Sequence, residues 1–531
     1  MEFGWKISLR KKYAWCSYRT NSARAIGSRC LLTGQIFAVD LGMYKTCPLT
    51  DGDFKEKQLY TGPGGDLGVL KMSLVGQQDG TVDIYFVQKH GEVIRINGKN
   101  SSQDILDTLP VDFFGEYGLV GIATDPEINI NGLLYVIYTA SENGNNFRYN
   151  ISRFKLITDK KKLDKSSEKI LMTFPAKRKD WHSAGAMAFD AYGDLYIAIG
   201  DNMQVDEGPG NTADYRGGIL RIHPDVSYKG YSIPKGNFAE VFSAAYKSQG
   251  NDAMSKDYLD TSKVKPEIYV KGTCNAYTIQ LDPVRRWLAW GDVGPDQGKV
   301  FGIKNLPAIE EPIYPKVESC AMTGPIFRYD GRIKSVNNFP PQFNRKWIVN
   351  DCNASNDWKL LSLNDAGDKV ISNIGIFKQF DGHTIVDIKQ GPNGALYYVS
   401  WNAGIFRIDY TGSCKDQSLV PEATGCAEPT ASNYDATIPK TFNDPRLCVN
   451  SSSVKKQFLT DDKISFSASK ITIKISGKHE LDIFNNAGQK IWRHQGEGQA
   501  EISLPGLKRG VYQLRLKENS ELFYLTFYSE K

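Results

Sequence analysis

Residues 190–201 read DAYGDLYIAIGD, in which turn-forming Asp and Gly residues precede a short run of aliphatic and aromatic residues. Such a turn followed by such a run is typical of short antiparallel strands. The pattern occurs six times between residues 64 and 410, centred on the aromatic residues Tyr85, Tyr135, Tyr196, Trp290, Trp347 and Tyr397. The spacing suits four-stranded units of about 40–50 residues repeated radially, and it is too long and regular for a two-sheet sandwich. We therefore predict an all-β chain built on a six-bladed β-propeller.

The composition changes on both sides of this repeat, which predicts four segments. Residues 1–55 are expected to form an irregular leader, and residues 56–412 the propeller. Residues 413–458 are rich in Cys, Pro and Ser and predict a linker that contains a small Cys-bounded module. Residues 459–531 return to alternating polar and apolar positions, which predicts a C-terminal β-sandwich.

The charge of the chain is concentrated at its N-terminus. The full sequence has 65 Lys and Arg residues against 60 Asp and Glu, a formal net charge of +5. Residues 1–30 hold seven of these bases and one acid, so the rest of the chain is almost neutral. A nearly neutral body has no general field that would gather nucleic acid. No run of about 18 apolar residues occurs, so no transmembrane span is expected.

The basic N-terminal segment does not read clearly as an export signal. Arg10, Lys11 and Lys12 could form the basic start of a signal peptide, but polar and charged residues interrupt the stretch that follows. A signal peptide requires an uninterrupted apolar core there. A misassigned start or added residues remain equally good explanations of this segment.

Generic catalytic motifs are absent from the sequence, which leaves one His-containing segment as the candidate site. No metalloprotease, phosphate-loop, dinucleotide or serine-hydrolase motif occurs. His182 precedes one expected strand and Asp201 follows the next. Strand ends of this kind can meet at the mouth of a propeller channel, where a His can act as a general base because its pKa lies near neutrality. A His that only holds its own loop is the alternative reading.

Several segments resemble the glucose/sorbosone dehydrogenase family. They are WHSAGAMAFDAYGDLYIAIGDN (181–202), GEYGLVGIATDPEININGLLYVIYT (115–139) and PEIYVKGTCNAYTIQLDPVRRWLAWGDVGPDQ (266–297), and they occur in the family's order. The resemblance extends over residues 60–410. It implies a six-bladed propeller that uses pyrroloquinoline quinone (PQQ) and calcium to oxidise the C1 hydroxyl of an aldose or oligosaccharide to the lactone.

The resemblance also implies roles for individual residues. The catalytic base of the family corresponds to His182, and its acidic substrate contact corresponds to Asp201. Asn275 corresponds to an Asn that binds the cofactor. The carbonyl groups that bind calcium correspond to Gly294 and Pro295, with Asp296 as the acidic ligand that follows them.

Other positions depart from the family pattern. Cys274 stands where the family has a cofactor-binding Arg, and Glu116 stands at a substrate position where the family has Gln. Lys299 stands near the expected calcium ligands, and the Arg residues expected before the last repeat are replaced by His383, Thr384 and Val386. Because PQQ carries three carboxylates, the loss of these cations implies weaker binding of the cofactor, at roughly 1.5–3 kcal/mol for each charged hydrogen bond.

The C-terminal fifth resembles segments of exported proteins. Residues 425–448 resemble a short Cys-bounded repeat, which implies a disulfide between Cys426 and Cys448 in an oxidising compartment. The stretches LDIFNNAGQKIW and LKRGVYQLRL resemble the C-terminal sorting domain of the type IX secretion system. The resemblance implies that this machinery is a partner and that the protein is secreted or displayed on the cell surface.

Two functions remain open at this point. The first is a PQQ-dependent dehydrogenase in which His182 removes the hydroxyl proton and Asp201 orients the sugar. The second is a propeller without PQQ that binds carbohydrate or protein at its mouth, where Trp181 could stack against a sugar ring. The retained His182, Asp201 and Asn275 favour the first function, and the substituted cation positions favour the second.

Overall fold

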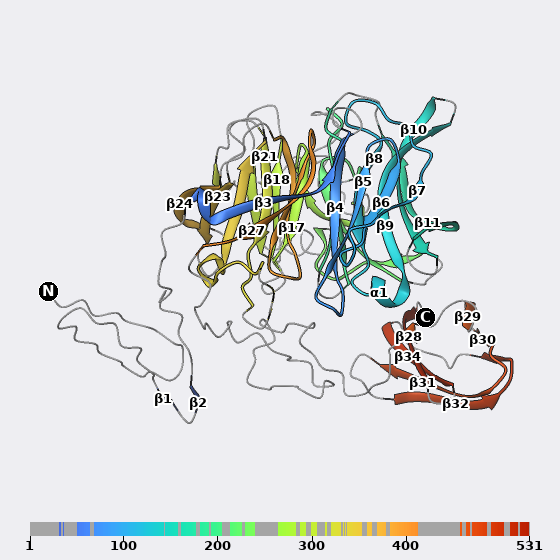
Figure 1. The fold of residues 1–531 in the computed structure, drawn as a ribbon. Helices are drawn as coiled ribbons and strands as arrows, with labels where there is room; N and C mark the ends of the chain where they lie inside the picture. The colour runs from blue at the N-terminus through green and yellow to red at the C-terminus, as the bar shows by residue number, and fades with distance from the viewer. Residues whose placement is uncertain are drawn as a thin grey trace, which may run out of the picture. The chain divides into compact units, whose positions relative to one another are not determined.

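The computed structural model describes most of residues 50–412 and 464–529, together with residues 31, 32, 35, 36, 457 and 458. Its larger gaps are residues 177–180, 204–212, 239–263, 294–298, 305–313, 353–357, 364–368 and 504–509. Almost all of the described chain that is regular is β-strand, which confirms the all-β prediction (Figure 1). The chain divides into two units, residues 1–46 and residues 47–531, and in the first of them β1 (Leu31–Leu32) pairs with β2 (Gln35–Ile36).

Six antiparallel sheets follow one another along residues 54–410. The first contains β4 (Val69–Gly76), β5 (Val82–Gln88), β6 (Glu92–Ile96) and β7 (Gln103–Thr108). The second contains β8 (Leu119–Thr124), β9 (Leu133–Glu142), β10 (Asn145–Leu156) and β11 (Leu163–Pro175). In the third, β12 (Ala184–Phe189), β13 (Leu195–Ile199) and β14 (Gly218–Pro224) are followed by β15 (Tyr231–Ser232) and β16 (Ile268–Lys271), which both pair with β14.

The remaining three sheets have the same order. The fourth contains β17 (Ala276–Leu281), β18 (Trp287–Asp292), β19 (Lys299–Lys304) and β20 (Tyr314–Pro315). The fifth contains β21 (Ala321–Ile326), β22 (Lys346–Asp351), β23 (Trp358–Leu363) and β24 (Val370–Lys378). The sixth contains β25 (Ile385–Gln390), β26 (Leu396–Ser400), β27 (Gly404–Tyr410) and the N-terminal β3 (Phe54–Thr61). Short helical turns lie at α1 (Ile128–Asn131), Asp51–Asp53 and Pro341–Phe343.

The sheets close into a ring through their first strands. β4 contacts β8, β8 contacts β12, β12 contacts β17, β17 contacts β21, β21 contacts β25, and β25 contacts β4 again. The ring is also closed within its last sheet, which takes its outer strand, β3, from the start of the chain and pairs it with β27 (Figure 1). This closure removes the free edge that β27 would otherwise present.

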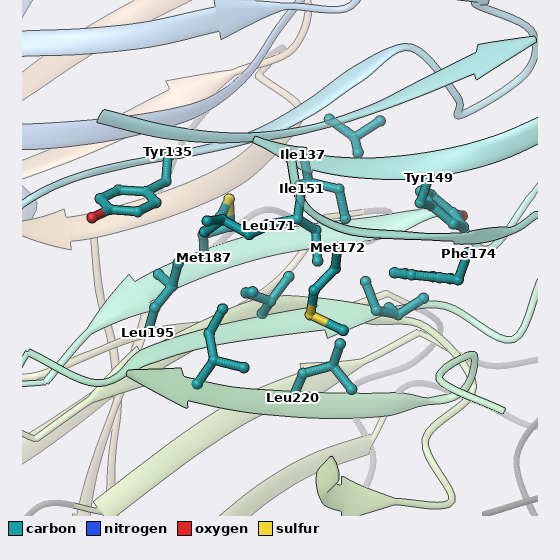
Figure 2. Close-up of a cluster of buried hydrophobic side chains, with 14 of the residues drawn as sticks. Tyr135, Ile137, Tyr149, Ile151, Leu171, Met172, Phe174, Met187, Leu195 and Leu220 are labelled. Carbon is teal, nitrogen blue, oxygen red and sulfur yellow. The ribbon is translucent and has the colours of Figure 1, made fainter. Parts of the chain in front are cut away.

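Apolar side chains fill the space between neighbouring sheets. Figure 2 shows Tyr149, Ile151 and Phe174 of the second sheet facing Leu195 and Leu220 of the third, and all five are buried. Each sheet of a propeller is covered on both faces by its neighbours, so the sequences of its inner strands are nearly continuous apolar runs. β8 (LVGIAT) and β13 (LYIAI), for example, are buried along their whole length.

One disulfide lies within the described part of the ring. It joins Cys320, just before β21, to Cys352, just after β22, with their Cα atoms 5.3 Å apart. It therefore links the neighbouring ends of the first two strands of the fifth sheet. The sequence left open which of the thiols at positions 274, 320 and 352 lie together, and the structure assigns the pair. The expected disulfide between Cys426 and Cys448 lies outside the described residues.

Residues 457–529 form a separate group of β-sheets. One sheet has the order β28 (Gln457–Phe458), β35 (Glu521–Ser529), β34 (Gly510–Glu518), β31 (Lys478–Asn485) and β32 (Lys490–Glu497), and the other contains β29 (Ile464–Ser467), β30 (Lys470–Ile473) and β33 (Ala500–Ser503). Buried aliphatic residues from both sheets, including Ile471, Leu481 and Ile502, make one core. No helix in the described residues is long and apolar enough to cross a membrane.

Candidate active site

The segments that precede the first strands of the second, third and fourth sheets meet at one end of the ring. Glu116 precedes β8, His182 precedes β12, and Asn275 precedes β17. The carboxylate of Glu116 accepts hydrogen bonds from the backbone N–H of His182 (2.8 Å) and from the side-chain amide of Asn275 (3.3 Å). Three segments far apart in the sequence are thus joined at the mouth of the channel.

His182 is held in an unusual backbone conformation. Its φ is 66°, and Asn202 and Met203 share this left-handed region with φ values of 56° and 57°. Non-glycine residues adopt it rarely, and such residues cluster at functional sites. The carbonyl of His182 accepts hydrogen bonds from the backbone and the side chain of Asn202, at 3.2 and 3.0 Å. The surrounding structure therefore fixes the strained residue in place.

His182 and Asp201 form a hydrogen-bonded pair. The distance between His182 Nδ1 and Asp201 Oδ1 is 2.6 Å, and Asp201 is fully buried. A carboxylate can only accept, so Nδ1 carries the hydrogen, and Nε2 carries the lone pair whenever the ring is neutral. Burial of the ring opposes its protonation, but the hydrogen bond and charge of Asp201 outweigh burial and raise the pKa of His182. The pair thus provides an oriented base.

Asp292 completes the support of this pair, although no motif in the sequence pointed to it. Its Oδ1 accepts the backbone N–H of Asn275 (2.7 Å) and that of Cys274 (3.1 Å). The carbonyl of Cys274 in turn accepts the backbone N–H of Asp201 (2.7 Å). Burial raises the pKa of Asp292 to about 6. Asp292 is the last residue of β18, and acidic residues are common at strand ends. Only the fold therefore connects Asp292 to the site.

Glu116 and Trp181, the two predicted substrate contacts, differ in their surroundings. Glu116 Oε2 accepts three donors of the protein itself, the third being the backbone N–H of Ser183 (3.1 Å). Burial raises the pKa of Glu116. Trp181, in contrast, is 58% exposed while its carbonyl accepts the hydroxyl of Tyr117 (3.3 Å). The first therefore organises the loops, and the second presents its ring to solvent next to His182.

Lys71 lies in the channel and was not identified from the sequence. It belongs to β4, yet its Nζ lies 3.7 Å from the ring centroid of Tyr277 on β17, which is three sheets away around the ring. The same ammonium donates to the carbonyl of Val386 on β25 (2.9 Å). Lys71 thus spans the channel from one wall to the opposite one. Burial lowers its pKa to about 7, despite the nearby charge of Asp387.

The lowered pKa of Lys71 makes a testable contribution to stability. Between pH 7 and 10.5 the unfolded chain binds a proton at Lys71 that the folded protein has lost, so stability from this group rises with pH. At pH 6 we expect the free energy of unfolding to be higher for Lys71→Met than for the wild type. This difference in stability should shrink towards pH 10. Denaturant unfolding at several pH values measures it, with the exposed Lys55→Met as control. A difference that stays constant with pH would contradict the assignment.

The described residues at the mouth do not fit a tri-anionic quinone such as PQQ. The ionisable groups that surround His182 are the carboxyl groups of Glu116, Asp201 and Asp292. Lys71 donates to a carbonyl and Arg216 is paired with Asp214, although Nη1 of Arg216 is buried without a hydrogen-bond partner among the described residues. An anion beside three carboxyl groups would be repelled by them and would find few free donors and cations there. Lys177, Arg178 and Lys179, the basic residues that precede His182 in the sequence, lie outside the described residues.

Two acceptors of the site lack partners. Asp201 Oδ2 and Asn275 Oδ1 are buried and have no hydrogen-bond partner among the described residues. Buried polar atoms nearly always have one, so these two call for a donor. Both atoms are closed to solvent, so a ligand would reach them only after a movement of the surrounding residues. The expected calcium ligands Gly294, Pro295 and Asp296 lie outside the described residues, and within these residues no group of three or more His, Cys, Asp or Glu side chains is placed to hold a metal ion.

Comparisons with known proteins agree with this architecture. Residues 72–304 match the family model described as glucose/sorbosone dehydrogenase, and residues 467–525 match the model described as secretion system C-terminal sorting domain. A solved structure of a glucose dehydrogenase is 19% identical with a TM-score of 0.51, and the match covers 66% of this chain and 98% of that chain. The apo-form of the soluble aldose sugar dehydrogenase from Escherichia coli is 17% identical with a TM-score of 0.50, covering 67% and 99%.

At these identities the likeness to solved structures concerns the fold alone. No curated protein matches the sequence. The two family matches, with the β-propeller fold of the structural neighbours, confirm both resemblances that the sequence motifs suggested. The chain thus matches the glucose/sorbosone dehydrogenase model within its ring of sheets and the secretion system C-terminal sorting domain model near its C-terminus.

Proposed function

We propose that the mouth around His182 binds a neutral, hydroxyl-rich ligand, an aldose or an oligosaccharide, and that His182 Nε2 accepts the hydrogen of one of its hydroxyl groups. The observation that carries this proposal is the 2.6 Å bond from His182 to buried Asp201, which leaves Nε2 as an acceptor. The exposed ring of Trp181 could stack against a sugar ring.

Proton transfer is the chemistry that these residues can support. His182 would take the proton of the C1 hydroxyl, and the carboxylate of Asp201 would stabilise the resulting imidazolium and keep the ring in its orientation. This role favours a second candidate function, the oxidation of C1 to the lactone. That reaction also needs an acceptor for two electrons, which PQQ with calcium supplies according to the family resemblance. Because the described residues do not fit PQQ, we derive no step that involves it.

Sugar binding can be tested separately from oxidation. The full chain, titrated calorimetrically with glucose and with cello- and malto-oligosaccharides in the absence of PQQ, should bind at least one of them. We expect His182→Ala to weaken binding about tenfold, since one hydrogen bond contributes roughly 0.5–1.5 kcal/mol. His223→Ala removes a comparable His–Asp pair, with Nδ1 and Asp194 Oδ1 at 2.9 Å, and serves as the control. A second series adds PQQ, calcium and a redox dye.

The outcomes separate the two functions. Binding without dye reduction would support a carbohydrate-binding propeller. Dye reduction that disappears in His182→Ala would support the dehydrogenase. Absence of binding in both series, with every sugar, would contradict the proposal.

The pH dependence of binding tests the role of Asp201. The hydrogen bond and charge of Asp201 raise the pKa of His182, so the protonated ring should block acceptance of a hydroxyl hydrogen below this raised value. Affinity of the wild type should therefore increase with pH through the pKa of His182. Asp201→Asn should lower that pKa and move the midpoint to lower pH, as measured by calorimetry and by NMR titration of the imidazole. An unchanged midpoint would show that Asp201 does not control the protonation of His182.

The sorting domain supports a proposal about location. We infer that residues 459–531 direct export of the propeller through the type IX secretion machinery to the cell surface or the medium, as the family match suggests. In a bacterium with this machinery, the full chain should appear outside the outer membrane, whereas a chain that ends at residue 458 should remain inside. Immunoblotting of the cell fractions measures this. Equal export of both chains would contradict the inference.

A further inference from the structure

Three aromatic side chains are exposed at the end of the ring where His182 lies. Phe113 is 46% exposed, Phe114 42% and Trp181 58%. Every other Phe, Tyr and Trp with a described side chain is buried or half-buried, and those of the ring pack between its sheets, as Trp290 does. A local group of exposed large apolar side chains usually marks a binding surface.

The two connections that carry these rings converge on the proposed base. Residues 109–118 connect the outer strand β7 of the first sheet to the inner strand β8 of the second, and Trp181 belongs to the corresponding connection between β11 and β12. Both connections end at the same point, because Glu116 accepts the backbone N–H of His182 (2.8 Å). Phe114 is two residues from Glu116, so their Cα atoms are at most about 7 Å apart. The exposed rings therefore lie next to the mouth around His182.

The segment that carries the two Phe residues is held by hydrogen bonds on both sides. The backbone N–H of Asp112 donates to the carbonyl of Thr139 (2.9 Å), and the hydroxyl of Thr139 donates to the carbonyl of Asp112 (2.6 Å). The carbonyl of Phe114 accepts the backbone N–H of Tyr117 (2.8 Å), whose hydroxyl donates to the carbonyl of Trp181 (3.3 Å). The backbone is thus ordered before a ligand arrives, so binding costs less conformational entropy.

The ring of Phe113 is itself supported on one face. Its centroid lies 3.8 Å from that of His90, with an interplanar angle of 18°. The exposed part of the Phe113 ring therefore belongs to its opposite face and its edge. A flat apolar surface of this kind can stack against the C–H face of a pyranose ring.

The arrangement of the rings favours a carbohydrate over a protein partner. Asp112, Gly115 and Glu116 flank the two Phe residues, so polar groups and backbone separate the aromatic surface from its surroundings. A stable protein interface typically covers about 800 Å² of each partner around a contiguous apolar centre. Flat rings between polar groups instead match a chain of sugar units, because each unit has apolar C–H faces and a rim of hydroxyl groups.

We propose that Phe113 and Phe114 form a platform for the second unit of an oligosaccharide whose first unit lies at His182. This placement rests on the proposed function, which puts a sugar hydroxyl at His182. It narrows the ligand from an aldose or an oligosaccharide to a chain of at least two units. Trp181, the direct neighbour of His182, stacks against the first unit in this assignment.

The platform predicts that affinity increases with the length of the sugar chain. Calorimetric titration of the full chain with glucose, cellobiose, cellotriose, maltose and maltotriose, without PQQ, measures this. In the wild type the better trisaccharide should bind about tenfold more tightly than glucose, and Phe113→Ala and Phe114→Ala should each lower this ratio roughly threefold, as expected for the loss of one aromatic contact. Phe113→Tyr keeps the ring and should keep the ratio. Ile105→Ala, which removes a side chain that is 65% exposed on the outer strand β7, is the matched control.

Saturation-transfer NMR identifies the sugar unit that contacts the platform. Saturation of the aromatic protons of the wild type should reach the C–H protons of both units of a bound disaccharide. In the double variant Phe113→Ala/Phe114→Ala only the unit beside Trp181 should retain this transfer. Both Phe side chains are largely exposed, so the variants should keep the melting temperature of the wild type, which separates loss of the platform from loss of the fold.

The outcomes distinguish this inference from the proposed function. Equal affinity of the wild type for glucose and for the trisaccharides, or an unchanged ratio in both Phe variants, would overturn the platform and leave sugar binding at His182 intact. Transfer to both sugar units in the double variant would also overturn it. Absence of binding with every sugar would contradict the proposed function and the platform together.

Discussion

Removal of residues 1–61 should prevent the protein from folding into a stable ring. This truncation deletes β3, which pairs with β27 from the contact between Tyr410 and Phe54 to that between Gly404 and Thr61. Phe54 is 5% exposed and packs against Phe339, with ring centroids 5.7 Å apart. Loss of a buried Phe side chain alone costs about 3–5 kcal/mol, a large part of the roughly 5–15 kcal/mol that stabilises a typical domain.

The truncation also exposes the edge of β27, where unpaired backbone groups promote aggregation. We expect a lower melting temperature and a high-molecular-weight fraction in size-exclusion chromatography. The matched control removes residues 1–49 only and so retains the complete β3–β27 ladder. A synthetic peptide of residues 50–62, added during refolding, should partly restore the truncated chain. If the two truncated proteins melt at the same temperature, β3 does not close the ring.

β3 also shows what the sequence could not provide about the fold. The inner strands were recognisable because both of their faces are buried, which leaves apolar runs such as LYIAI in β13. β3 reads FKEKQLYT, and most of its residues are exposed or half-buried because it is the outer strand of its sheet. Nothing local marks it as the partner of a strand that lies about 350 residues later in the chain. The closure depends on the ring as a whole.

The candidate site divides in a similar way. His182 and Asp201 follow a motif and lie at neighbouring strand ends, so the sequence identified both of them, and the structure brings them within 2.6 Å. Lys71 and Asp292 are single charged residues on strands of the first and fourth sheets, without a motif of their own. Their burial near the channel depends on contacts between distant sheets. Glu116 could be placed at the site from its position in the sequence. Its hydrogen bond to the backbone of His182 could not be foreseen, because it too depends on contacts between distant sheets.

Gly200→Ala should abolish the proposed sugar binding, although Gly200 has no side chain that could contact the sugar. A Cβ atom on Gly200 would lie 2.0 Å from the carbonyl oxygen of His182 and 2.4 Å from its carbonyl carbon. These are backbone atoms that cannot rotate away, so the segment of His182 has to move. That segment already holds φ at 66° and is fixed by Asn202, so a shift breaks its hydrogen bonds as well. Overpacking of this kind costs about 1–3 kcal/mol or more.

We expect the affinity of Gly200→Ala for sugar to fall at least as far as that of His182→Ala, with a melting temperature below that of the wild type. Gly52→Ala is the control, because its added Cβ meets nothing nearer than Thr50 Oγ1 at 3.8 Å. NMR signals of the His182 imidazole separate the local effect from general destabilisation, since the signals should move even at temperatures where the variant is fully folded. Wild-type affinity together with unchanged imidazole signals would mean that the strand of Gly200 does not hold His182. The base would then have to be positioned by Glu116 and Asp201 alone, through their bonds to its backbone N–H and its ring.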